Sequence, residues 1–200
     1  MFGLIRTTII ALVLAFNAGS ILAQDFQKGL TAAQSGDYVT ALQEWRPLAE
    51  QGDAVVQYNL GVMYEKGWGV LQDYAEAEKW YQLAAEQGNA FAEYNLGVMY
   101  EKGNGVLQDY AEAVKWYRLA AEQGNASAQN NLGTIYELGN GVLQDNVRAH
   151  MWYNIAAANG AEKSGEWRDQ IAAKMTSADI SKAQSMAKEC LSSKYKNCGW

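Results

Sequence analysis

The chain has 200 residues, and 49% of them are hydrophobic. It contains a single Pro and carries a formal net charge of −6. This much apolar material supplies a core and excludes a largely disordered chain. The acidic balance argues against a nucleic-acid-binding protein, which needs a basic face. We therefore expect a folded protein with no nucleic-acid partner.

Residues 1–23 have the pattern of a secretory signal peptide. One positive residue, Arg6, precedes an apolar run over residues 8–16, and small residues lead to Ala23. Cleavage is expected after Ala23. The run is shorter than the ~20 apolar residues of a membrane span, although an uncleaved anchor is the alternative. The pattern predicts a periplasmic or secreted protein without a stable membrane anchor after cleavage.

After this segment, residues 24–37 predict a lone N-terminal capping helix, and residues 38–160 contain a repeat. The stretch "YNLGVMYEKG" occurs at 58–67 and returns unchanged at 94–103. Such repeats mark a solenoid, whose units bury their apolar faces by stacking on one another. The frame of 36 residues fits about three and a half times. Two copies of it differ at five places: Trp68/Asn104, Glu78/Val114, Gln82/Arg118, Phe91/Ser127 and Glu93/Gln129.

Each unit reads as two antiparallel helices and a loop. Asp73, with Glu76 three residues later, predicts a helix start, and Gly88 provides the stop. Asn89 can cap a second helix, which Gly103 ends before a glycine-rich loop over residues 103–109. Pro47 lies inside the first helix of the first unit and is expected to kink it or end it early.

Three glycines recur in the middle of the second helix of successive units. Gly61, Gly97 and Gly133 each cost ~1 kcal/mol relative to Ala at such a position. Their recurrence in register predicts a backbone contact that a Cβ would obstruct. The paired aromatic residues of the first helices, such as Trp80 and Tyr81, are expected to fill the space between units.

The register fails after Gly160, so residues 161–200 are expected to form C-terminal capping helices and a tail. Thr176 and Asp179 predict the start of the last helix. Cys190 and Cys198 are the two cysteines of the chain. In an oxidising compartment such a pair usually closes a disulfide, with free thiols as the alternative. A metal site needs more ligands, so no metal or other cofactor is expected.

The repeat resembles the Sel-one-like repeat (SLR), a relative of the tetratricopeptide repeat. The matching pattern is A-x-A-x-K-W-Y-x-L-A-A-E-Q-G-N-A-x-A-x-x-N-L-G, followed by Y-E-x-G-x-G-V-x-Q-D, and it spans roughly residues 38–160. The family usually has Pro where Leu71, Leu107 and Leu143 stand. The resemblance implies an all-α, right-handed superhelical solenoid of helix pairs, used as a scaffold for other proteins. It implies no shared reaction, and its bacterial members are often exported.

No catalytic constellation emerges from the sequence, so we expect a non-enzymatic protein. His150, the sole His, lacks a Cys or Ser–acid partner in the pattern, which favours a structural or surface role. Some secreted relatives carry a β-lactamase label, and S-x-x-K occurs at 185–188 and 193–196. The S-D-N and K-T-G motifs that accompany it in those enzymes are missing, so we interpret both matches as chance.

The candidate binding positions are those that vary while the frame stays fixed. Trp68, in "KGWGV", is expected to be exposed, and exposed Trp is enriched at protein-binding hot spots; folding back onto a neighbouring loop is the alternative. The polar face of the first helices is the expected concave wall, with a plain solvated face as the alternative. Its candidate residues are Lys79, Gln82, Lys115, Arg118 and Asn154.

These features predict an exported monomeric scaffold that binds a protein or an extended peptide along its concave face. A cell-envelope protein that binds peptidoglycan or β-lactams, with weak or no hydrolase activity, is the alternative. It depends on the family resemblance and the compartment alone.

Overall fold

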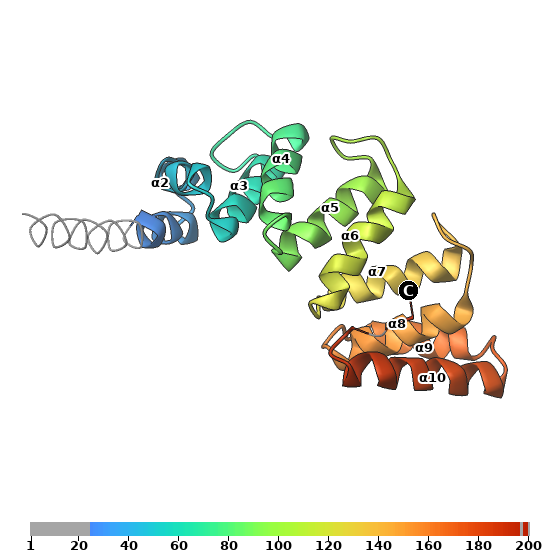
Figure 1. Cartoon of the computed structure of the whole chain (residues 1–200). Helices are drawn as coiled ribbons and strands as arrows, with labels where there is room; N and C mark the ends of the chain where they lie inside the picture. The colour runs from blue at the N-terminus through green and yellow to red at the C-terminus, as the bar shows by residue number, and fades with distance from the viewer. Residues whose placement is uncertain (1–24, 197, 200) are drawn as a thin grey trace, which may run out of the picture. The chain divides into compact units, whose positions relative to one another are not determined.

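A computed structural model of the chain describes residues 25–196, 198 and 199. All regular structure in this range is helical (Figure 1). The chain forms two compact units, one ending at Trp80 and the other beginning at Tyr81. The predicted signal peptide, residues 1–23, lies outside the described residues. Within them, each helix is too short or too polar to cross a membrane.

The first unit contains a helix whose described part covers residues 25–34, followed by α2 (Tyr38–Glu50), α3 (Ala54–Lys66) and most of α4 (Tyr74–Ala85). The indole Nε1 of Trp45 donates to the carbonyl of Phe26 at 3.2 Å, which fastens the first helix to α2. The apolar faces of α2 and α3 meet in one core. Its buried residues are Ala41, Trp45, Leu48, Ala49, Val56, Leu60 and Met63.

Pro47 does not end α2 early, so that half of the expectation was wrong, and the kink stays a prediction. The helix continues for three residues beyond it, to Glu50. A proline removes one backbone donor and excludes one carbonyl from its usual bond. Close to the end of a helix this loss is small beside the burial of Leu48 and Ala49, which are 5% and 1% exposed.

The second unit runs from the end of α4 through α5 (Ala90–Lys102), α6 (Tyr110–Glu122), α7 (Ala126–Leu138) and α8 (Asn146–Ala158). Each of the helices α5 to α8 packs against the next. The C-terminal helices α9 (Ser164–Ala172) and α10 (Ser177–Ser192) both pack on α8 (Figure 1). Ile171 of α9 and Ala187 of α10 belong to the same buried core as Met151 and Ile155 of α8.

Apart from the end of α2, the predicted helix starts at Asp73, Asn89 and Thr176 and the predicted stop at Gly103 are confirmed. The carboxylate of Asp73 accepts hydrogen bonds from the backbone N–H groups of Ala75 and Glu76. Asn89 caps α5, and Thr176 caps α10 through the N–H of Asp179. Gly103 ends α5 with φ of 71°, a left-handed conformation that glycine adopts without steric cost.

The recurrent glycines in the middle of the helices lie against an aromatic ring and not against the backbone of a neighbouring helix. A Cβ on Gly97 would lie 2.5 Å from the ring of Tyr117, and a Cβ on Gly133 would lie 2.5 Å from the ring of Tyr153. Both rings are buried, at 0% and 2% exposure. The expectation that a Cβ would cause a clash is confirmed, but the expected backbone contact was wrong because the bulky side chain is the closer neighbour.

Cys190 and Cys198 form the expected disulfide. It closes a short loop behind α10, where the hydroxyl of Tyr195 donates to Asn159 at 3.0 Å and Arg148 donates to the carbonyl of Gly199. Two parts of the chain, the tail and α8, are thereby held together.

Replacing Cys190 and Cys198 by Ser should lower the free energy of unfolding by about 2 kcal/mol, because a short loop restricts the unfolded chain only modestly. Urea denaturation of the variant and the oxidised parent checks this. An effect above about 5 kcal/mol would show that the tail contacts, and not only the loop, depend on the bond.

Candidate functional site

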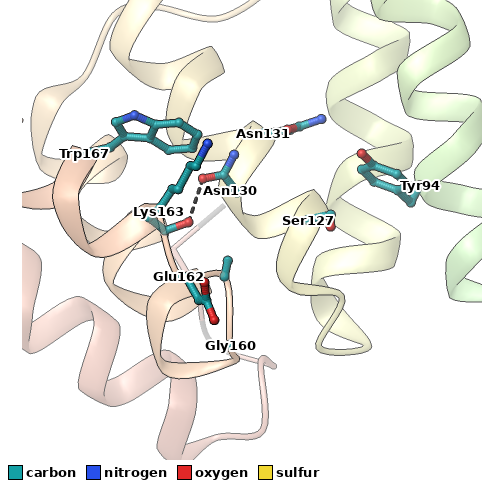
Figure 2. A pocket seen from close by; sticks show the side chains of 10 residues that line it. Tyr94, Ser127, Asn130, Asn131, Gly160, Glu162, Lys163 and Trp167 are labelled. Atoms are coloured by element: carbon teal, nitrogen blue, oxygen red, sulfur yellow. Dashed lines mark hydrogen bonds between the residues drawn. The ribbon is translucent and has the colours of Figure 1, made fainter.

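A groove of about 420 Å³ opens on the second unit and combines aromatic walls with a polar floor. Figure 2 shows Tyr94 and Trp167 at its two sides, with the α7 residues Ser127, Asn130 and Asn131 between them. Tyr94 belongs to α5 and Trp167 to α9. Residues 160–163, between α8 and α9, and Ser164 at the start of α9 complete the lining, with one acid, Glu162, and one base, Lys163.

The aromatic walls rest on the two tyrosines that the helix glycines admit. The rings of Tyr94 and Tyr117 lie 5.9 Å apart, and those of Trp167 and Tyr153 lie 5.8 Å apart, measured between centroids. A buried tyrosine needs a partner for its hydroxyl. Tyr117 donates to Glu101, and Tyr153 donates to Glu137 at 2.9 Å. The repeat geometry therefore fixes both sides of the groove.

The polar floor is held by internal hydrogen bonds. The hydroxyl of Ser164 donates to the Oδ1 atom of Asn130 at 2.7 Å (Figure 2). Asn131 also lines the floor. Ser127 is exposed at the first turn of α7. An amide held through one of its atoms can use its remaining donors and acceptors to bind a ligand, and a peptide backbone offers both kinds of group.

Trp68 is 41% exposed, yet its ring stacks on Tyr38 with the centroids 4.8 Å apart and the planes at 13°. The prediction of exposure and the alternative of folding back thus each hold in part. Together with Trp45, Asn59 and Met63, it lines a smaller cavity of about 230 Å³ in the first unit.

The predicted helix face does not gather at either cavity. Lys79 and Lys115 are exposed, and each forms an ion pair with a glutamate three residues earlier on its own helix. Gln82 donates to Glu86 at 3.3 Å. Such exposed pairs contribute little to stability, and both lysines remain accessible.

Arg118 and Asn154 have internal hydrogen bonds. The guanidinium of Arg118 donates to the hydroxyl of Tyr136 at 2.9 Å, and the Oδ1 atom of Asn154 accepts from Arg168 at 3.2 Å. Both side chains are half-buried. A partner that used them would compete with these bonds.

His150 is buried, with 2% of its surface exposed, so the surface interpretation was wrong and the structural one holds. Its Nδ1 atom has no hydrogen-bond partner within the described part of the chain. Burial, followed by the positive charge of Arg168, lowers the pKa of this imidazole. Burial thus favours the neutral form of this side chain.

The groove residues were missed because their signal lies in departures from the repeat. Ser127 replaces Phe91, and Asn130 replaces Tyr94, so a large side chain is lost from the same face twice. Trp167 stands where the register would place another Asn after Asn131. The groove thus forms where the last full repeat and the C-terminal cap deviate from the pattern. Across the described residues, no cluster of three or more metal-ligating side chains occurs.

Comparison with known proteins identifies the repeat. The Sel1 repeat model matches residues 54–89, 90–125 and 126–160, more than half of the chain. A comparison with curated proteins finds no match. Sel1 repeats commonly mediate protein–protein interactions and are typically non-catalytic scaffolds.

Two solved structures share the fold. The protective antigen c5321 of uropathogenic Escherichia coli, which displays an SLR fold, is 44% identical with a TM-score of 0.70; the match covers 76% of this chain and 33% of that one. A Sel1 repeat protein from Oxalobacter formigenes is 36% identical with a TM-score of 0.66, covering 70% of this chain and 56% of that one. This chain therefore spans less than two thirds of either relative. With its three matched repeats and its all-α fold, it belongs to the Sel1 repeat family.

Proposed function

We propose that this chain is an exported, monomeric scaffold that binds an extended segment of another protein in the groove between α5, α7 and α9. The observation that carries the proposal is the groove, which has two aromatic walls and a floor with Asn side chains. It lies in a fold of Sel1 repeats, a family that commonly mediates protein–protein interactions. Tyr and Trp are enriched among the few residues that dominate the binding energy at protein interfaces. Asn side chains can pair with the donors and acceptors of a peptide backbone.

The export part of the proposal is supported by the Cys190–Cys198 disulfide, since such bonds persist in oxidising compartments. The signal-peptide pattern of residues 1–23 points the same way. Periplasmic and secreted locations both satisfy these observations. Within the second unit, Gln82 and Lys115 are further candidate contacts outside the groove, and Lys79 and the exposed part of Trp68 are separate candidates on the first unit.

The alternative of β-lactam binding receives no support from the geometry. Ser185 and Lys188 are exposed on α10, away from the residues that line the groove. The hydroxyl of Ser193 donates to the carbonyl of Cys190 at 2.9 Å. A nucleophilic serine needs a base within hydrogen-bond reach, and neither S-x-x-K match lies in a described cavity.

Selection of a displayed peptide library on the purified protein tests the proposal. Peptides that bind the parent should bind the Trp167→Ala variant at least about tenfold more weakly, since a central aromatic anchor is lost. Ser127→Phe should obstruct the floor and have a comparable effect. Fluorescence anisotropy of the selected peptides measures both.

The matched control is Val55→Phe, which introduces the same ring at the equivalent position of the first unit, where Val55 is already 52% exposed. It should leave affinity unchanged. Peptides whose affinity is insensitive to both groove variants would place the binding surface elsewhere, with Trp68 and Gln82 as the next positions to substitute.

A further inference from the structure

One buried position of the repeat alternates between an amide and an acid. Gln57, Glu93 and Gln129 occupy equivalent places in successive repeats. Their exposed fractions are 4%, 3% and 0%. A buried polar side chain is tolerated when its hydrogen bonds are made, so the bonds of the two glutamines show what this place requires.

The glutamines donate to a backbone carbonyl eight residues upstream. The Nε2 atom of Gln57 bonds to the carbonyl of Ala49 at 3.0 Å, and that of Gln129 bonds to the carbonyl of Ala121 at 3.0 Å. In the same register, the carbonyl that corresponds to Glu93 is that of Ala85, at the end of α4. An ionised carboxylate has no proton to donate to it.

At this repeat position a second hydrogen bond, accepted by the side chain, is present both for the amide Gln129 and for the acid Glu93. Asn159 donates to the Oε1 atom of Gln129 at 2.7 Å, and its equivalent Gln123 donates to the Oε2 atom of Glu93 at 2.7 Å. A carboxyl group can therefore accept this hydrogen bond as well as an amide can. An ionised Glu93 lacks only the donor for the carbonyl of Ala85, and a protonated carboxyl group supplies that donor.

We propose that Glu93 is a proton-operated latch within the second unit. With the proton bound, it donates to the carbonyl of Ala85 and accepts from Gln123, which ties α5 both to the end of α4 and to the residue that follows α6. Loss of the proton removes the first bond and leaves a buried negative charge. The latch lies next to Tyr94, so it holds the α5 wall of the groove.

The electrostatic surroundings favour the protonated form. Burial, as the largest cause, raises the pKa of Glu93 to about 7, while the hydrogen bond from Gln123 acts in the opposite direction. Glu122, on α6, is the charged group that acts on it and raises the pKa further.

The contribution of Glu93 to the free energy of unfolding depends on pH, because its pKa is higher in the folded protein than in the unfolded chain. Because the folded state holds the proton more tightly than the unfolded chain, the stabilisation by Glu93 is full below pH 4.5 and is lost as pH rises through about 7. His150, whose pKa is lowered, acts oppositely at acidic pH. Comparing variants at each pH cancels its contribution.

The experiment is urea denaturation of the parent and of Glu93→Gln, which introduces the residue of the other two repeats. The ratio of their unfolding constants, parent over variant, should rise roughly 70-fold from pH 5 to pH 8. The reciprocal variant Gln129→Glu should acquire a pH dependence of the same sign. Glu86→Gln removes an exposed carboxyl group and is the control. Its unfolding constant should depend on pH in the same way as that of the parent.

A carbon-13 NMR titration of the Glu93 carboxyl group tests the proposal independently of folding yield. A midpoint near 7 supports the latch. A midpoint near 4.5 overturns it, as does a parent-to-Glu93→Gln ratio that is the same at both pH values.

Discussion

Substituting Val for Gly97 is expected to lower the free energy of unfolding by about 3 kcal/mol, because overpacking a filled interior forces neighbours out of place. A Cβ at this position would lie 2.5 Å from two ring atoms of Tyr117. That ring is fully buried and its hydroxyl is bonded to Glu101, so it has little room to move. Urea denaturation of the variant at constant pH measures the loss.

The matched control is Gly165→Ala on α9, where no atom lies within 4 Å of an added Cβ. This change should be neutral or stabilise by up to about 1 kcal/mol, because it restricts the unfolded chain. Because Tyr117 supports Tyr94, Gly97→Val should also weaken peptide binding in the groove. A variant with the stability of the parent would show that the ring shifts freely, contrary to the packing described above.

Substituting Ala for Trp152 is expected to destabilise the protein by about 3–5 kcal/mol, the usual cost of removing a large buried side chain. Trp152 is 1% exposed and belongs to the core that α8 shares with its neighbours. The cavity left behind adds to the lost transfer energy because the surrounding helices relax only in part.

The equivalent position one repeat earlier provides the comparison. Trp116 is only half-buried, so Trp116→Ala should cost clearly less than Trp152→Ala in the same denaturation experiment. Equal losses would mean that the two tryptophans stabilise their repeats alike and that the cover of α9 and α10 over α8 adds nothing. A smaller effect at Trp152 would contradict the packing outright.

Much of the fold could be predicted from the sequence because its signals are local. The capping residues Asp73, Asn89 and Thr176 act on N–H groups two or three residues away, and Gly103 supplies a backbone angle within its own residue. The repeat period adds the pairing of helices, since each unit must bury its apolar stripe on the next. The pairing of Cys190 with Cys198 required only a count of two cysteines.

The candidate site could not be predicted in the same way. Lys79, Gln82, Lys115, Arg118 and Asn154 were selected because they vary on one helix face, yet their hydrogen bonds and ion pairs lie elsewhere than the groove. Variation between repeats reports where packing is permissive, and such places need not be where cavities open. Trp68 does line a cavity, the smaller one of the first unit, and its part in binding stays a prediction.

The sequence by itself therefore determined the all-α repeat, the helix boundaries other than the end of α2, the family and the pairing of the two cysteines, because each depends on neighbours in sequence or on a fixed period. The tertiary structure alone decided that Tyr117 and Tyr153 fill the space above two glycines, that Tyr94 and Trp167 face a common groove, and that Glu93 is buried. These properties arise from side chains brought together across different helices. Their distances and exclusion from water depend on how those helices pack, which no local pattern records.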